Sequence, residues 1–169
     1  MTTINLGCGN DMFGDVRVDI VQTKATTHVM DLSLPWLFPD ESFDATYSKN
    51  LLEHLPNPQF FFREAFRVLK RKGKLTLITD NAACLKYYVL GTHTGGYIGE
   101  SILSRSGFDR HYSIFTMEHV RNHLELSGFK ILILKLIDTT FFTKRFDKFV
   151  RWVVPSLSYP RIYVEALKW

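Results

Sequence analysis

The chain opens with Thr2-Thr3-Ile4-Asn5-Leu6, a short β-type run, and this run stops at Gly7-Cys8-Gly9-Asn10. Glycine lets the backbone approach a ligand closely, and successive main-chain N–H groups can receive an anion. A strand that ends in a glycine loop is typical of the first strand of an open α/β sheet, where ligands bind outside the carboxyl ends of the strands. The stretch therefore predicts both a fold class and the place of a site.

Strands and helices alternate along the rest of the chain. Further strand patterns lie at Val16–Ile20, His28–Met30, Phe43–Tyr47, Lys74–Thr79, Lys130–Ile137 and Arg161–Leu167. Helical spacing of apolar residues predicts a helix from Pro58 to about Lys70, ended by Gly73, and a second helix between the N-cap Thr116 and Gly128. Two more helices are expected at Leu85–Leu90 and Lys144–Val154.

This order predicts a doubly wound α/β sheet, mostly parallel, in a single domain over residues 1–169. One crossover is unusual. Only Cys8 to Asp15 separate the first two strands, which is fewer residues than a helical crossover needs, so we expect a single turn or an irregular loop there. Residues 84–115 hold scattered glycines and are interpreted as a possible lid or acceptor-binding segment.

Polar residues stand at the carboxyl ends of the predicted strands. Asp19 ends the second strand, Asp31 ends the third, and Ser48-Lys49-Asn50 follows the fourth. A carboxylate after the second strand can accept hydrogen bonds from the two hydroxyls of a ribose. With the glycine loop, these residues describe a site for an adenosine that carries a short charged tail. Asp31 could instead cap a turn that continues through Ser33.

The same residues, taken in order, resemble the class I S-adenosylmethionine-dependent methyltransferases. The motifs are Leu6-Gly7-Cys8-Gly9-Asn10, Val18-Asp19, Met30-Asp31-Leu32, Pro39-Asp40-Glu41-Ser42-Phe43-Asp44, Asn50-Leu51-Leu52-Glu53-His54-Leu55 and Phe62-Arg63-Glu64-Ala65-Phe66-Arg67-Val68-Leu69-Lys70. The last two motifs are similar to the type 11 subgroup that includes quinone-biosynthesis methyltransferases. The resemblance implies a Rossmann-like, seven-stranded sheet whose last strand is antiparallel and whose first crossover helix is shortened here.

The resemblance also implies a cofactor, S-adenosyl-L-methionine, with S-adenosyl-L-homocysteine as its product. The expected cofactor-binding residues are Leu6, Gly7, Cys8, Gly9, Asn10, Asp19, Ile20, Asp31, Leu32, Ser48, Asn50 and Leu51. Among them, Gly7 and Gly9 would lie against the methionine moiety, Asp19 on the ribose and Asp31 beside the adenine. Ser48 to Leu51 would line the sulfonium side.

Acid–base candidates are few. A base is needed only if the acceptor must lose a proton in or before the transition state. We put forward His111 and His54 as catalytic candidates, although His111 can equally be a surface-loop histidine and His54 a hydrogen-bonded structural one. His119 and His123 have metal-ligand spacing, but no third ligand is evident, so no metal is expected.

Charge and composition limit the kinds of ligand and partner that the protein is expected to bind. Residues 1–60 carry three Lys/Arg against eight Asp/Glu, which suits a cationic small ligand, whereas residues 120–169 carry nine against four. The basic segment 144–153 is amphipathic and could contact a membrane surface. Two cysteines and no apolar run of membrane-spanning length predict a cytoplasmic protein. A chain of 169 residues leaves little room for an RNA-binding module, so nucleic acid is not expected as a partner.

These observations predict an enzyme that methylates a small-molecule, sugar or lipid-headgroup acceptor, with O- or C-methylation favoured. The position after the fourth strand reads Ser48-Lys49-Asn50-Leu51 and lacks the aromatic-proline motif of many amino-group methyltransferases. The alternative is a catalytically inactive, methyltransferase-like binding or regulatory subunit. A nicotinamide-dependent enzyme fits poorly, because the loop lacks the third glycine of the G-x-G-x-x-G pattern and leaves little room for the helix that follows it. The acceptor and the oligomeric state are not readable from the sequence.

Overall fold

The computed structural model describes residues 1–84, 111–137, 150 and 152–169. The predicted helix at Leu85–Leu90, most of the expected lid over 84–115 and most of the predicted helix Lys144–Val154 lie outside these residues. The described residues form one sheet with helices packed on it, and none of the described helices has the length and apolar character needed to cross a membrane.

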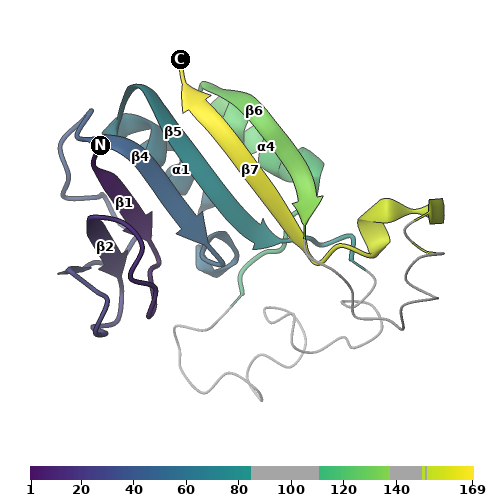
Figure 1. Ribbon diagram of the computed structural model, residues 1–169, viewed down its shortest axis with the longest axis horizontal. Helices are drawn as coiled ribbons and strands as arrows, with labels where there is room; N and C mark the ends of the chain where they lie inside the picture. Colours follow the sequence, from purple (N-terminus) through teal and green to yellow (C-terminus); the bar gives the residue numbers. More distant parts are fainter. Residues whose placement is uncertain (85–110, 138–149, 151) are drawn as a thin grey trace.

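Seven strands form the sheet in the order β3-β2-β1-β4-β5-β7-β6 (Figure 1). They are β1 (Thr3–Leu6), β2 (Val16–Asp19), β3 (His28–Val29), β4 (Phe43–Lys49), β5 (Leu69–Asp80), β6 (Phe129–Ile137) and β7 (Arg161–Lys168). The neighbours from β3 to β5 are parallel, whereas β7 runs antiparallel to both β5 and β6. The predicted mostly parallel α/β sheet with an antiparallel last strand is confirmed. Strand order reverses between β1 and β4, so the carboxyl ends of these strands flank a crevice.

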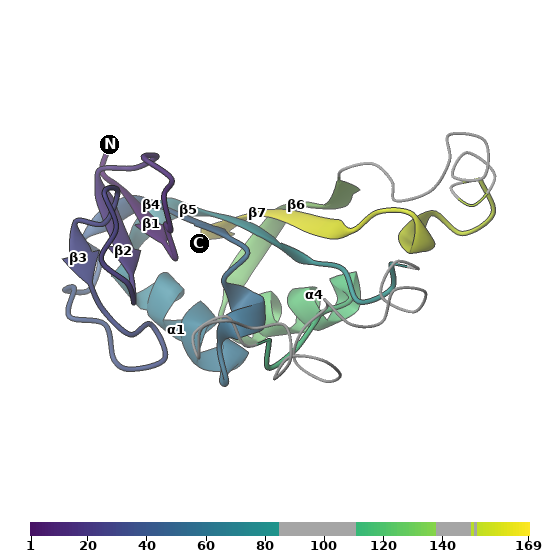
Figure 2. The ribbon, with the colours of Figure 1, turned by 90° about the horizontal axis from the view of Figure 1, so that it is seen from below.

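Two α-helices, α1 (Pro58–Val68) and α4 (Met117–Leu126), lie on the same face of the sheet (Figure 2). The side chain of Asn57 caps α1 by accepting from the N–H of Phe60, and Thr116 caps α4 by accepting from the N–H of His119. Two short 3-10 helices, η1 (Leu52–His54) and η2 (Pro155–Leu157), follow β4 and precede β7. The sequence predicted the cap at Thr116, and Gly128 ends the α4 segment with a φ of 90°.

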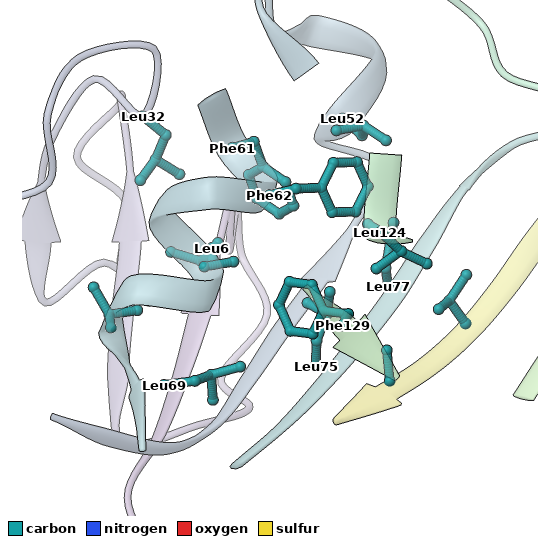
Figure 3. Close-up of a cluster of buried hydrophobic side chains, with 14 of the residues drawn as sticks. Leu6, Leu32, Leu52, Phe61, Phe62, Leu69, Leu75, Leu77, Leu124 and Phe129 are labelled. Carbon is teal, nitrogen blue, oxygen red and sulfur yellow. The ribbon is translucent and has the colours of Figure 1, made fainter. Parts of the chain in front are cut away.

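The core lies between the sheet and these helices (Figure 3). Leu6, Leu75 and Leu77 rise from the sheet, and Phe62 and Leu124 meet them from α1 and α4. All five side chains are fully buried. The apolar stripe that predicted α1 therefore faces the strands, as the helical period requires.

Most strands differ from the sequence prediction by one or two residues at one end, and the largest difference lies between α1 and β5. Helix α1 ends at Val68 rather than near Lys70, and Gly73 lies inside β5 instead of ending the helix. Leu69 already pairs with Phe43, and the register then shifts so that Lys74 pairs with Ala45. A Cβ on Gly73 would stand 2.8 Å from the carbonyl oxygen of Lys70, so glycine serves this irregular turn of the strand. Burial of Leu69 and its strand pairing outweigh another turn of helix.

The crossover from β1 to β2 contains no helix, in agreement with the expectation of an irregular loop. Residues 7–15 instead fold back over the sheet. The ring of Phe13 packs edge-on against Tyr47 with centroids 4.8 Å apart, and the Asn5 side chain donates to the Phe13 carbonyl at 3.1 Å. Asp15 closes the loop by accepting from the Thr3 N–H at 2.7 Å. Polar side chains thus hold this loop where a helix would otherwise cover the sheet.

Candidate functional site

A pocket of about 830 Å³ opens at the carboxyl ends of β1, β2 and β4. Its lining is Asn5, Gly7, Cys8, Gly9, Asn10, Asp11, Asp19, Ile20, Val21, Met30, Asp31, Leu32, Ser33, Tyr47, Lys49, Asn50, Leu51, His54, Leu55, Pro56 and Tyr112. These residues come from the edge that the sequence predicted, where the arrowheads of β1 and β4 end in Figure 1. The volume lies within the range of pockets that hold nucleotide-sized ligands.

The glycine loop needs its glycines. Gly7 and Gly9 have φ values of 70° and 52°, in the left-handed region that side chains disfavour. A Cβ on Gly7 would approach the side chain of Leu51 to 2.9 Å. The amides of Gly7 and Cys8 both donate to the Val18 carbonyl, which holds the loop against the end of β2. These two hydrogen bonds fix the glycine loop beside the end of β2.

Asp19 is fixed in the pocket by the backbone on both sides. One carboxylate oxygen accepts from the N–H of Gly9 at 2.8 Å, and the other accepts from the N–H of Val21 at 3.0 Å. Each carboxylate oxygen can accept more than one hydrogen bond, so both keep acceptor capacity for a ligand. The spacing of two such oxygens matches two neighbouring hydroxyls.

Asp31 caps a turn, which is one of the two roles that the sequence predicted for it, and it also lines the pocket. Its Oδ1 accepts from both the main-chain N–H and the hydroxyl of Ser33, at 2.9 and 2.6 Å. The carboxylates of Asp19 and Asp31 therefore each orient a loop and also line the pocket. Beside Asp31, Met30 and Leu32 give this end of the pocket an apolar lining.

The carboxyl end of β4 differs from the sequence prediction, because the strand continues through Ser48 and Lys49. Ser48 is fully buried and its hydroxyl donates to the Leu6 carbonyl at 3.1 Å, so it supports the pocket from below. The lining residues here are Lys49, Asn50 and Leu51. Leu6, another predicted cofactor-binding residue, is also fully buried and absent from the lining.

Several lining residues, among them Asn5, Asp11 and Tyr47, are absent from the site residues expected from the sequence. Asn5 on β1 and Tyr47 on β4 line the pocket, and Lys49, which the expectation for Ser48 to Leu51 included, is exposed at the end of β4. Strand alternation could have placed Asn5 and Tyr47 on one face. Only the loop conformation of residues 7–15 shows that this face borders the pocket.

His54 and His111, proposed from separate motifs, lie together. Their ring centroids are 4.5 Å apart and the ring planes are nearly perpendicular, at 87°. His54 lines the pocket from η1, and Tyr112, the neighbour of His111, also lines it. The structure thus puts two imidazoles beside the pocket, where a neutral imidazole can accept a proton.

Glu53, which sequence reasoning did not single out, is the most perturbed acid near the pocket. It is 1% exposed, and burial, followed by the nearby Asp80, raises the pKa of its carboxyl to about 7. The Thr79 hydroxyl donates to this carboxyl at 2.8 Å. The available signal was a charged residue within the leucine-rich stretch Leu51-Leu52-Glu53-His54-Leu55.

The pair His119 and His123 has structural contacts. His119 belongs to the cap of α4, and His123 hydrogen-bonds the Gln59 side chain at 2.7 Å and stacks on Phe62. Burial lowers the pKa of His123. In the described part of the chain, no group of three or more His, Cys, Asp or Glu side chains is arranged to hold a metal ion.

One protein-family model matches part of the chain. Residues 10–77 match the family model of a methyltransferase domain, whereas no curated protein matches the chain. The fold is shared with solved structures of low sequence identity. An S-adenosylmethionine-dependent methyltransferase from Mesorhizobium loti aligns with a TM-score of 0.67 at 19% identity, covering 98% of this chain and 90% of that one.

Two further structures are similar. A putative methyltransferase from Bacillus halodurans aligns with a TM-score of 0.64 at 17% identity, over 98% of this chain and 91% of that one. The third structure is the complex between the Haloferax volcanii Trm112 methyltransferase activator and the putative methyltransferase. One of its chains aligns with a TM-score of 0.65 at 15% identity, over 99% of this chain and 82% of that one. These alignments show the fold, and the match to the methyltransferase family model covers residues 10–77.

Proposed function

We propose that this chain is a class I S-adenosylmethionine-dependent methyltransferase, whose pocket binds S-adenosylmethionine and presents the methyl group to a small-molecule acceptor at the His54–His111 side. The acceptor class we propose is a small molecule, sugar or lipid headgroup methylated at oxygen or carbon. Cytoplasmic location and membrane contact through residues 144–153 stay predictions.

The observation that carries the proposal is the placement of Asp19. Its two oxygens are oriented by the amides of Gly9 and Val21, and both face a pocket at the reversal of strand order. We assign these oxygens to the ribose hydroxyls of the cofactor. Gly7 to Gly9 then lie at the methionine moiety, and Asp31 and Leu32 lie at the adenine.

The charge of the pocket agrees with this ligand. Three carboxylates, those of Asp11, Asp19 and Asp31, line the pocket, against one lysine, Lys49. A sulfonium compound with a free ammonium group is attracted by such a surface, because charges in a cleft act through a lower effective dielectric than in water. The acidic N-terminal part of the sequence is thus concentrated at the site.

S-Adenosylmethionine supplies a methyl group on a positively charged sulfur, which leaves as a neutral thioether when the acceptor's lone pair forms the new bond. The protein has to align the acceptor with the carbon–sulfur bond and keep water out. We assign the alignment to Lys49, Asn50 and Leu51 at the end of β4. His54 or His111 then takes the proton that the acceptor gives up, and passes it to water.

A second candidate, a methyltransferase-like subunit that binds without turnover, is favoured by one observation. The wall of the pocket formed by residues 7–15 is a loop, held by the side chains of Asn5 and Asp15 rather than by a helix. The Haloferax volcanii structure is a complex with a methyltransferase activator, and under this second candidate a partner protein completes the corresponding wall in this chain. Binding of the cofactor product without methylation of any acceptor would support this candidate.

Calorimetric titration with S-adenosylhomocysteine tests the proposal, with NAD as the control ligand. We expect saturable binding of the nucleoside alone, and a loss of about 100-fold in affinity for Asp19→Ala, because two hydrogen bonds to a charged group are removed. Asp40→Ala is the matched control, since Asp40 is exposed and pairs with Arg67 away from the pocket. Thermal melting of each variant separates lost binding from lost fold.

Each outcome is informative. Unchanged affinity of Asp19→Ala would contradict the ribose assignment, and failure of the unaltered protein to bind would contradict the proposed cofactor site. With binding established, labelled methyl transfer to an acceptor panel tests the histidines. His54→Gln and His111→Gln should keep S-adenosylhomocysteine binding and lose turnover on acceptors that must be deprotonated.

A further inference from the structure

Glu53 is a buried acid that the proposed reaction does not use. It lies in η1 between Leu52 and His54, and its side chain points away from the pocket lining into the protein. The carboxyl is held by the Thr79 hydroxyl near the carboxyl end of β5. An acid in such a place costs folding free energy when charged, so its presence calls for a reason.

The main chain of the same residue holds the segment that carries His111. The Glu53 carbonyl accepts from the N–H of Tyr112 at 2.8 Å and from the N–H of Ser113 at 3.4 Å. Tyr112 lines the pocket, and the ring of His111 contacts that of His54. One residue therefore joins η1, β5 and segment 111–113, and both candidate catalytic histidines are its neighbours.

Charged and titratable groups surround the carboxyl from each element that packs on it. Asp80 on β5 destabilises the carboxylate, while Arg161 on β7 and the Thr79 hydroxyl stabilise it. His54 lies next in sequence, and His111 and Tyr112 lie on the segment bound by the Glu53 carbonyl. Burial and Asp80 dominate, and together they raise the pKa of the Glu53 carboxyl to about 7.

We propose that Glu53 is a positioning residue, whose protonated carboxyl holds the His54–His111 pair in place beside the pocket and whose carboxylate form loosens it. The catalytic meaning of this device rests on the proposed function, because it assumes that the pair faces the acceptor.

The physical reason lies in the pairing with Asp80. A protonated Glu53 carboxyl is neutral, and inside the protein it accepts a hydrogen bond from the Thr79 hydroxyl. After the proton leaves to water, two carboxylates, Glu53 and Asp80, repel each other across a poorly solvated space. Outward movement of η1 relieves that repulsion by admitting water. Because η1 also carries the Glu53 carbonyl and His54, its movement releases both the Tyr112 amide and the histidine contact.

Amide hydrogen exchange measured by NMR on the full chain, without any ligand, tests the proposal. We expect the protection factor of the Tyr112 amide, corrected for the intrinsic pH dependence of exchange, to fall about tenfold between pH 5.5 and 8.5, with a midpoint near the titration of Glu53. Glu53→Gln, which stays neutral and keeps the shape, should remove the pH step and stay protected. Glu165→Gln, which removes an acid from β7 on the other face of the sheet, is the matched control and should keep the step.

A step that persists in Glu53→Gln, or no step in the unaltered protein, would overturn the proposal. Thr79→Val provides a test that does not depend on Glu53→Gln folding, because loss of the stabilising hydroxyl should move the midpoint to higher pH, whereas Thr79→Ser should restore it. An unmoved midpoint in Thr79→Val would also count against the proposal. The measurement needs no cofactor, so failure to bind S-adenosylhomocysteine would refute the proposed function and leave this result standing.

Discussion

The strands beside the pocket are short and joined by loops, whereas the strands on the far side are long and packed under helices. β1, β2 and β3 have four, four and two residues, while β5 and β7 have twelve and eight. In the first region, side chains bind main-chain groups of the loops, as Asp15, Arg17 and Asp19 do. In the second region, α1 contacts β5 and α4 contacts β6 through apolar side chains.

The difference separates two tasks within one domain. The helix-covered region buries most of the apolar surface and can supply the free energy of folding. The pocket region is then free to expose polar groups and to hold loops in conformations that a ligand needs. We expect substitutions in the first region to act mainly on binding, and substitutions in the second to act mainly on stability.

The largest effect is expected at the core of the helix-covered region. Phe62→Ala removes a fully buried ring that contacts Phe61 and His123, and should lower the free energy of unfolding by about 3 to 5 kcal/mol. Phe13→Ala is the matched control in the pocket region, where the ring is 53% exposed, and should cost about 1 kcal/mol. Urea unfolding of both variants measures the two values. Equal losses would contradict the division between the regions.

The next effect is a dependence of stability on pH. The pKa of Glu53 is raised from 4.5 to about 7, so the folded state holds a proton that the unfolded chain releases. Stability from this group is therefore complete below pH 4.5 and is lost as the pH rises through about 7, by roughly 3 kcal/mol. Unfolding of the unaltered protein and of Glu53→Gln by urea, from pH 4.5 to 8.5, measures it.

The free energy of unfolding should fall with rising pH in the unaltered protein and not in Glu53→Gln. Asp44 and Glu64 have lowered pKa values because of Lys70 and Arg67, so their contributions disappear on the acid side instead and are shared by both proteins. Parallel stability curves for the two proteins would contradict the assignment of the raised pKa to Glu53.

The sequence predicted most of the fold because its signals are local. Apolar alternation marked the strands, and the Thr116 cap and Gly128 marked the ends of α4. Gly73 misled because a glycine after a helical stretch usually ends a helix, whereas here the pairing of Leu69 with Phe43 had already ended it. Such competition is decided by tertiary packing, which no local pattern contains.

The site was predictable at the strand ends and less so elsewhere. Asp19 and Asp31 were found because they follow strands, and both face the pocket. The contact between His54 and His111 joins residues far apart in the sequence, so spacing could nominate each histidine but not the pair. Burial of Glu53 likewise depends on Thr79 and on segment 111–113, which reach it only in the folded chain.

The smallest effect on stability, and the sharpest test of the comparison, is expected from Arg17. Its guanidinium donates to the Ala25 carbonyl at 2.6 Å and to the Gly14 carbonyl at 2.7 Å, and so ties together the loops after β1 and β2. Arg17 is absent from the pocket lining. Arg17→Gln should lower the free energy of unfolding by about 1 to 2 kcal/mol, because hydrogen bonds from a charged donor are lost.

The same substitution should weaken S-adenosylhomocysteine binding without removing a ligand contact. The two loops carry Gly9 and Val21, whose amides orient the carboxylate of Asp19, so freeing the loops adds an ordering cost to binding. Arg71→Gln, at an exposed position of β5, removes the same charge far from the pocket and should leave affinity unchanged. If Arg17→Gln lost stability but kept full affinity, the loops beside the pocket would be held by the sheet itself, and the proposed dependence of the site on side-chain to main-chain hydrogen bonds would be wrong.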